Sequence, residues 1–257
     1  MRRIRLTIEY DGYAYAGWQR QENALAVQQV VEEKLSKLTG ERIAIIGASR
    51  TDAGVHALGQ VAAFDTESRI PAEKFSFALN TMLPTDIRIR ESAQAAEDFH
   101  PRFQAKGKLY RYRVYSAPHA SAIERNLCAH VIYPLDIDKM RAEAEHIVGR
   151  HDFAAFAASG SVVKDTVREM KAVSVEQNGP HFEIRIYGTG FLYNMVRIFA
   201  GTLIGVGSGK IEKGAIKRAI ETGDRLALGV TAPAHGLTLM RVDYEPVLQG
   251  QFLQDSL

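Results

Sequence analysis

Asp52 is the one carboxylate in the stretch GASRTDAGVHALGQVAAF, residues 47–64, whose other side chains are mostly small or apolar. Arg50 lies two residues before it, so an extended chain directs both side chains to the same side. An arginine in that position keeps a carboxylate ionised and oriented by charge and hydrogen bonding. Gly54 lets the backbone turn closely and leaves space above the carboxylate.

Four roles for Asp52 follow from its residue type: turn residue, metal ligand, salt-bridge partner or nucleophile. An Asp-Ala-Gly turn with a local side-chain cap explains the spacing without any chemistry. Asp52 and His56 form one possible ligand pair, but no second acidic or histidine cluster of suitable spacing lies near them in the sequence. A hydrolase with paired carboxylates requires a second acid for its mechanism, and this stretch lacks one.

Arg197 is the second candidate for chemistry, because it lies in the middle of the apolar stretch FLYNMVRIFAGTLIGVG, residues 191–207. That stretch predicts a helix that is buried on almost all sides. An unpaired buried charge costs several kcal/mol, so the guanidinium needs a carboxylate or a phosphate as its partner. Asp52 is one candidate; an ion pair with another acid, or an arginine that reaches the surface, are the alternatives.

Basic and aromatic residues alternate between residues 99 and 115, in FHPRFQAKGKLYRYRVY, which contains no acid. Cations that meet phosphates and rings that stack on bases are what an RNA-binding strand needs. Tyr110 lies on this strand, with Tyr112 on the same face. The alternative is a strand with a solvated basic face and a buried aromatic face, in which Tyr110 belongs to the core.

The periodicity of the sequence predicts the elements that position these residues, in a βαββαβ order that occurs twice. In the first half we expect strands at 2–10, 42–49, 59–66 and 86–94 and helices at 27–38 and 71–83. In the second half we expect strands at 108–116, 166–177, 181–188 and 236–244 and helices at 136–149, 191–207 and 212–223. Asp136 is a plausible N-cap for the helix that follows it.

Two such halves resemble two split βαβ, or ferredoxin-like, folds, which places the chain in the α+β class. We expect the halves to share one mostly antiparallel sheet, with an active-site cleft between them. The predicted boundary gives a half at 1–103 that carries Asp52 and a half at 104–257 that carries Tyr110 and Arg197.

Composition limits the class of protein further. The 257 residues are 46% hydrophobic and 24% charged with a net charge of +2, which is ordinary for a globular enzyme or binding protein. No apolar run is long enough to span a bilayer, and the first residues lack the apolar region of a signal peptide. A single cysteine, Cys128, excludes an internal disulfide framework. We therefore predict a cytoplasmic protein without a membrane partner.

Seven blocks of sequence, taken in order, resemble the tRNA pseudouridine synthase A family. They are YDGYAYAGWQRQ, RTDAGVHALGQVAAF, ALNTMLPTDI, FHPRFQAKGKLYRYRVY, GRHDFAAF, YGTGFLYNMVRIFAGTLIGVG and APAHGLTLMRVDY. The resemblance runs from about residue 3 to residue 244. It departs from the family at Pro101, where alanine is more usual, and at Arg150, where threonine is frequent; both departures concern RNA contacts.

The resemblance implies an isomerase that converts uridine to pseudouridine at positions 38–40 in the anticodon stem-loop of tRNA, without cofactor or metal. It assigns Asp52 as the catalytic aspartate and Tyr110 as the tyrosine that contacts the uridine. Arg50 and Arg197 correspond to the substrate-binding arginines that flank the aspartate. Family members are homodimers, so one tRNA can touch both subunits.

One ionised carboxylate suits this reaction, which replaces the bond from ribose C1′ to uracil N1 by a bond to C5. It can attack C1′ or C6, or deprotonate C2′, and these alternatives stay open. The uridine must leave the helix stack, at a cost of a few kcal/mol. Two other classes remain alternatives: a non-catalytic RNA-binding module and a metal-dependent nuclease.

Overall fold

The computed structural model describes residues 1–157 and 165–254, which form two compact units. The first unit comprises Met1–Lys106 and Leu239–Glu245. The second comprises Gly107–Thr238 and the chain from Pro246 onward. The chain therefore enters the second unit after Lys106 and returns to the first for most of its last strand.

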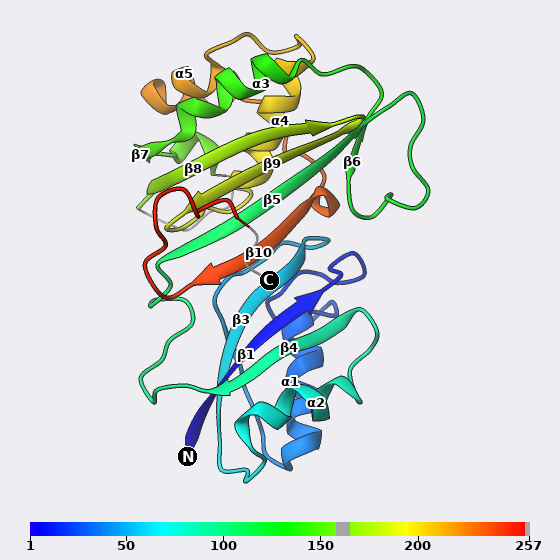
Figure 1. Cartoon of the computed structure of the whole chain (residues 1–257), viewed down its shortest axis with the longest axis vertical. Coiled ribbons are helices and arrows are strands. Elements are labelled where there is room, and N and C mark those ends of the chain that lie inside the picture. The colour runs from blue at the N-terminus through cyan, green and yellow to red at the C-terminus, as the bar shows by residue number, and fades with distance from the viewer. Residues whose placement is uncertain (158–164, 255–257) are drawn as a thin grey trace. The chain divides into compact units, whose positions relative to one another are not determined.

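The first unit is a mostly antiparallel sheet with its helices on one face (Figure 1). Its elements are β1 (Arg2–Tyr10), α1 (Val27–Thr39), β2 (Ile46–Gly47), β3 (His56–Thr66), the 3-10 turn Ala72–Lys74, α2 (Phe75–Asn80), β4 (Ile87–Gln94) and β10 (Leu237–Asp243). β1 lies between β3 and β4 and is antiparallel to both. β10 is the next neighbour of β3, and the short β2 pairs with β3 as well.

Alternation along β1 divides the first unit into a core side and an open side. Ile4, Leu6 and Ile8 are fully buried, whereas the residues between them are partly exposed. α1 contributes Val31 and Leu35, both fully buried, to the core. Because side chains alternate across a strand, the intervening arginines Arg3 and Arg5 lie on the side of the sheet away from the helices.

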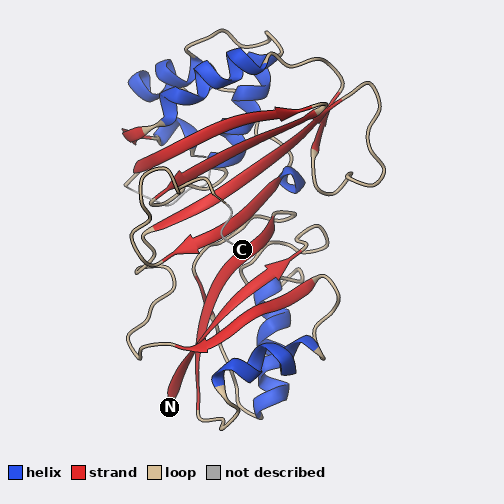
Figure 2. Ribbon diagram, viewed as in Figure 1, coloured by secondary structure: helices blue, strands red, loops and turns tan. Residues whose placement is uncertain are grey.

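The second unit has the same design (Figure 2). Its elements are β5 (Gly107–Ser116), β6 (Ala129–Val131), α3 (Ile137–Ala144), the 3-10 turn Glu145–Ile147, β7 (Gly149–Asp152), the 3-10 turn Ala154–Phe156, β8 (Val167–Asn178), β9 (His181–Gly188), α4 (Met195–Gly207), α5 (Ala215–Thr222) and the 3-10 turns Arg225–Ala227 and Ala234–Gly236. β9 lies between β5 and β8 and is antiparallel to both, β7 extends the sheet beyond β8, and β6 pairs with β5 in parallel.

The register of β5 and β9 shows which face of the second sheet is the core. Tyr110 pairs with Ile186 and Tyr112 with Ile184, and all four side chains are buried. Figure 1 shows α3, α4 and α5 on one face of this sheet.

The predicted α+β class and the βαββαβ order of the first half are confirmed. The N-cap is confirmed too, since the Asp136 carboxylate accepts the backbone N–H groups of Asp138 and Lys139. The strand predicted at 42–49 is reduced to Ile46–Gly47. The side chains of Ser36 and Glu32 on α1 accept the backbone N–H groups of Ile43 and Ile45. Those N–H groups therefore cannot pair with a neighbouring strand.

The second half differs from the predictions in three places. The helix predicted at 136–149 ends at Ala144 and is followed by the 3-10 turn Glu145–Ile147. β6 and β7 were not predicted; they are only three and four residues long. The helix predicted from residue 191 begins at Met195, because Asn194 adopts a left-handed conformation with φ 60° and interrupts it. No helix in the ranges 1–157 and 165–254 combines the length and apolarity that crossing a membrane requires.

Candidate functional site

Asp52 lies in the connection between β2 and β3, in a tight turn. The backbone N–H of Val55 donates to the carbonyl of Asp52 at 3.1 Å, and Gly54 takes the left-handed φ of 78° that this turn needs. Ser49 and Thr51 are buried, whereas Asp52 itself is partly exposed. The turn geometry predicted from Asp-Ala-Gly is therefore present, and it holds an aspartate that stays partly exposed.

The loop after β1, residues 11–18, fixes the backbone on both sides of Asp52. The N–H of Trp18 donates to the carbonyl of Thr51 at 3.1 Å, and the N–H of Gly54 donates to the carbonyl of Tyr15 at 3.2 Å. A side chain at Gly17 would bring its Cβ within 2.5 Å of the Thr51 carbonyl oxygen. Only glycine allows the two loops to approach this closely.

Two aromatic side chains, Tyr10 and Trp18, pack against the same loop. The hydroxyls of Tyr10 and Thr51 are 2.7 Å apart in a buried hydrogen bond. The Tyr10 ring stacks on Trp18, with ring centroids 6.1 Å apart, and the indole of Trp18 fills the space that a side chain at Gly47 would need. The stretch YDGYAYAGWQRQ thus acts as a packed support for the aspartate loop.

His56 is also part of this support. It is 4% exposed, and its Nδ1 accepts the backbone N–H of Gly12 at 3.1 Å. The imidazole thereby ties the start of β3 to the first loop. Nowhere in the described part of the chain do three or more His, Cys, Asp or Glu side chains gather closely enough to hold a metal ion.

Gln60 is a supporting residue that the sequence analysis missed. Its side chain is fully buried on β3, donates to the carbonyl of Ser49 at 2.6 Å and accepts the Ser49 N–H at 3.1 Å. The signal was a lone polar side chain in the apolar strand GQVAAF, because a buried amide must find hydrogen-bond partners. Here the partner is the backbone that leads into the aspartate turn.

Arg50 lies on the same loop as Asp52 but is exposed. It makes no hydrogen bond or ion pair with any residue in the ranges 1–157 and 165–254. An exposed guanidinium at the rim of a loop is well placed to meet a phosphate group.

Tyr110 belongs to the second unit. Its ring is 6% exposed and meets the ring of Phe191 edge to face, with centroids 4.9 Å apart. Its neighbour on the same face of β5, Tyr112, is fully buried and donates its hydroxyl hydrogen to the carbonyl of Pro233 at 2.8 Å. Tyr110 is therefore held in a fixed orientation by packing.

Arg197 lies in the first turn of α4, where two oxygen atoms orient it. Its Nε donates to the carbonyl of Ala232 at 2.9 Å, and a terminal nitrogen donates to Oδ1 of Asn194 at 2.7 Å. Burial raises the pKa of Tyr112, and the charge of Arg197 opposes that shift, so the guanidinium lies near the tyrosine face of β5. Asn194 is a second residue that the sequence analysis did not single out.

The four predicted site residues thus fall into two pairs. Arg50 and Asp52 share one loop of the first unit, and Tyr110 and Arg197 lie on β5 and α4 of the second. The predicted pairing of Arg197 with Asp52 stays a prediction. Chemically, the first pair offers a partly exposed acid and an exposed cation two residues apart on one loop. The second pair offers a ring and a cation that packing or hydrogen bonds keep oriented.

Comparison with known proteins gives a consistent result. A family model described as tRNA pseudouridine synthase matches residues 6–104 and 144–245. Asp52 and Arg197 fall inside these ranges, and Tyr110 falls between them. The tRNA pseudouridine synthase A of Ruminiclostridium cellulolyticum is 52% identical over 245 residues, which is 95% of this chain and 100% of that protein. That of Acetivibrio thermocellus is 51% identical over 244 residues, with the same coverage.

Among solved structures, a Cbf5-Nop10-Gar1 complex aligns with 97% of this chain and 50% of its own chain. The sequence identity is 13% and the TM-score 0.40, a likeness too weak to carry an argument.

Proposed function

Because the chain belongs to the tRNA pseudouridine synthase family, we propose that it isomerises uridine to pseudouridine in tRNA, with Asp52 as the catalytic carboxylate. The observation that carries the assignment of Asp52 is that the backbone on both sides of it is hydrogen-bonded to the loop after β1. Backbone hydrogen bonds from Trp18 and Gly54 hold the residues on either side of the acid, while the acid itself stays partly exposed. A reactive group needs this kind of fixed position at an accessible surface.

The reaction sets what Asp52 has to do. The bond from C1′ to N1 breaks, the uracil turns, a bond from C1′ to C5 forms, and C5 loses its proton while N1 gains one. Nothing is oxidised, so the reaction needs no cofactor. An ionised carboxylate can add to C1′ or C6 and leave again, or it can take the C2′ proton and return it.

The surroundings of Asp52 suit a nucleotide that has left its stack. Ala53 and Gly54 follow the acid and place no bulky side chain beside it. Base flipping costs a few kcal/mol, which contacts to phosphate and to the uracil must offset. The exposed guanidinium of Arg50, two residues from the acid, can supply one phosphate contact.

From the resemblance we assign Tyr110, Arg50 and Arg197 to substrate binding. Tyr110 would contact the uracil through its ring or hydroxyl, and its packing against Phe191 keeps the ring in one orientation. Arg197 would meet an anionic part of the substrate, and its bonds to Asn194 and Ala232 reduce the entropy lost when it does so.

The resemblance also supports finer proposals. We assign the modified uridines to positions 38–40 of the anticodon stem-loop, where loop and stem-end nucleotides are the least costly to flip. We further propose that the protein works in the cytoplasm as a homodimer.

Tritium release provides the direct test. The protein is incubated with tRNA that carries tritium at C5 of its uridines, and the label released to water is counted. Asp52→Asn is expected to lower the release rate by roughly a thousandfold or more, with tRNA affinity retained. Asp138→Asn, an acid on α3 whose side chain is 89% exposed, is the matched control and should act as the wild type does.

Each alternative predicts a different result. Release that survives Asp52→Asn would exclude this residue as the essential acid. A wild-type protein that binds tRNA but releases no tritium would be a non-catalytic RNA-binding module. A metal-dependent nuclease would cut the strand and stop on addition of EDTA, whereas isomerisation should continue.

A further inference from the structure

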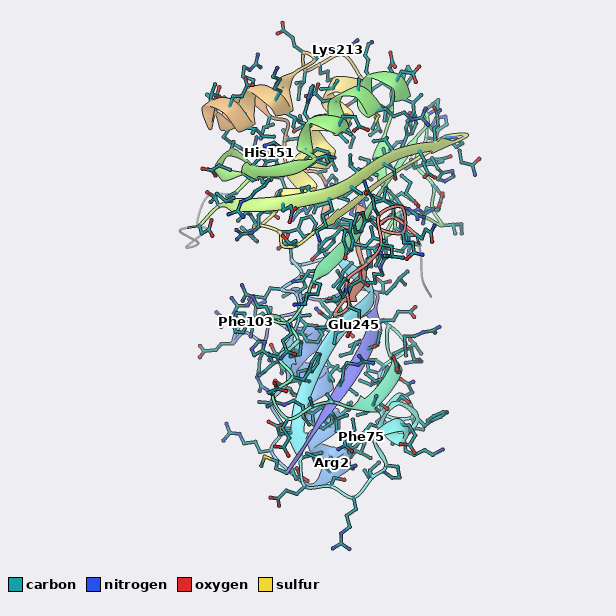
Figure 3. The ribbon with its side chains drawn as sticks, turned by 60° about the vertical axis from the view of Figure 1, so that its left-hand side comes forward. Arg2, Phe75, Phe103, His151, Lys213 and Glu245 are labelled. Carbon is teal, nitrogen blue, oxygen red and sulfur yellow. The ribbon has the colours of Figure 1, made fainter. Side chains whose placement is uncertain are left out.

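The segment between β4 and β5, residues 95–106, presents an aromatic ring to solvent. Phe103 is 78% exposed, and in Figure 3 it projects away from the ribbon of its unit. A single exposed ring is ordinary on a protein surface, so the residues around Phe103 decide whether it has a partner. Its chain neighbour Arg102 is exposed as well.

The segment that carries Phe103 is anchored at several points to the first unit. The carbonyl of Phe99 accepts a hydrogen bond from Arg3 at 2.9 Å, and the carbonyl of Pro101 accepts the Tyr244 hydroxyl at 2.8 Å. The Phe99 and Tyr244 rings meet with centroids 4.9 Å apart, and the N–H of Lys106 donates to Asp243. Phe103 is thus displayed by a fixed loop.

His100 sets the orientation of the exposed ring. The two rings lie 4.2 Å apart with a tilt of 31°. Nδ1 of His100 accepts the backbone N–H groups of Arg102 and Phe103 at 3.2 and 3.3 Å. One face of Phe103 is therefore backed by the imidazole, and stacking on the other does not require the ring to move.

A pocket of about 430 Å³ lies beside this segment, entirely within the first unit. Arg5 and Lys106 supply cations, Gln94 and Gln104 supply amides, and Phe99 and Tyr244 supply ring surface; Ala95, Ala96 and one acid, Glu245, complete the lining. A volume of a few hundred Å³ is the range of small-molecule and nucleotide pockets.

We propose that this segment and the pocket beside it form a second RNA-binding site, in which a nucleotide other than the reacting uridine stacks on Phe103. Arg102 and the cations of the pocket bind its phosphates. The proposal rests on the proposed function, since tRNA is the ligand. Arg5 and Tyr10, the residue that supports the Asp52 loop, are five positions apart on β1, roughly 16 Å. One nucleotide cannot occupy both places.

RNA fits this surface better than a second protein does. An exposed ring on a segment that also presents the exposed cations Arg102 and Lys106 is what base stacking with phosphate contacts requires. Stacking of this kind tolerates any base. A stable protein interface buries about 800 Å² on each partner around an apolar centre, which one phenylalanine does not supply. The surface thus matches a strand of nucleic acid passing over it.

The test measures affinity for unmodified tRNA transcript by fluorescence anisotropy at several salt concentrations. Phe103→Ala is expected to raise the dissociation constant about 5- to 150-fold, and Phe103→Trp to restore it. Phe77→Ala is the matched control, because Phe77 is another phenylalanine of the first unit, on α2, and is 69% exposed. Arg102→Gln should reduce the slope of log affinity against log salt by about 0.7–0.9.

Unchanged affinity in Phe103→Ala would refute the second site. So would a change of oligomeric state in that variant, seen by sedimentation, since the ring would then contact another copy of the chain. Tritium release by the wild type separates this inference from the proposed function. If the wild type releases tritium and Phe103→Ala binds tRNA as the wild type does, the second site is refuted and the proposed function stands. If Phe103→Ala binds tRNA more weakly but the wild type releases no tritium, the catalytic assignment is refuted and the second site stands.

Discussion

The hydroxyls of Tyr10 and Thr51 share a buried hydrogen bond of 2.7 Å, which joins the last residue of β1 to the residue before Asp52. The Tyr10 ring also stacks on the Trp18 ring, and the backbone N–H of Trp18 donates to the carbonyl of the same threonine. The aspartate loop therefore depends on a strand end and on an aromatic ring that lie outside it.

Loss of this hydrogen bond should affect turnover more than it affects tRNA affinity. Tyr10→Phe and Thr51→Val are each expected to lower the free energy of unfolding by about 1–2 kcal/mol, since each leaves a buried hydroxyl or a gap in the network. Both should slow tritium release, because the backbone next to Asp52 becomes less fixed. The double variant gives a coupling energy of about 1 kcal/mol if the two groups bond to each other. Strict additivity in urea unfolding would argue against it.

Gly17 should tolerate no side chain. It has φ 89°, and a Cβ there would lie 2.5 Å from the Thr51 carbonyl oxygen. Gly17→Ala is therefore expected to separate the two loops, to lower the free energy of unfolding by more than about 2 kcal/mol and to abolish most activity. Gly40→Ala is the control, since Gly40 has φ 75° with no atom within 4 Å of a Cβ. It carries only the backbone strain, and equal melting temperatures for the two variants would contradict the proposed contact.

The elements of the fold could be predicted because their periodicity is strong and local. The alternation in 2–10, the amphipathic pattern in 27–38 and the strands at 166–177 and 181–188 each depend on residues close together in the chain, and each matches the structure. The strand at 42–49 was overestimated because side chains of α1, distant in sequence, take its N–H groups. Periodicity carries no information about such competition.

The candidate catalytic and binding residues could be predicted from their types, whereas the residues that hydrogen-bond to them or to their loops could not. A lone acid between an arginine and a glycine singled out Asp52, and a charge in an apolar helix singled out Arg197. The bonds of Gln60 to Ser49 and of Asn194 to Arg197 depend on side-chain geometry that the sequence does not state. The sequence marks Gln60 as a polar residue in an apolar strand but does not show the partner of its amide, and the left-handed conformation of Asn194 is known only from its backbone angles.

Asn194 should act as a positioning residue for Arg197. Asn194→Gly keeps the left-handed conformation at φ 60° but removes the oxygen that accepts from Arg197. Folding should be retained while turnover falls roughly tenfold, because the guanidinium loses one of its orienting partners. Asn194→Asp keeps that oxygen and tolerates the same backbone angle, so it should restore the turnover number. Equal turnover in Asn194→Gly and the wild type would show that Asn194 serves the helix start alone.

Arg3 and Asp65 should make stability depend on pH in the acid range. They are opposite each other on β1 and β3, with hydrogen bonds of 2.8 and 2.6 Å. The Arg3 guanidinium lowers the pKa of Asp65 below its usual 3.8. The folded state therefore binds this proton less readily than the unfolded chain does. The stabilisation is complete above the unfolded pKa and is lost as pH falls through 3.8 toward the lowered folded pKa.

Asp65→Asn removes this contribution and the pH dependence that goes with it. Urea unfolding of wild type and variant between about pH 7 and about pH 3 should show the wild type more stable at neutral pH. The difference should shrink as the solution becomes more acidic. Glu97→Gln, at an exposed acid of the same unit, is the control and should follow the wild type throughout. A difference for Asp65→Asn that stays constant with pH would mean that the carboxylate contributes through packing, because lost packing does not respond to protonation.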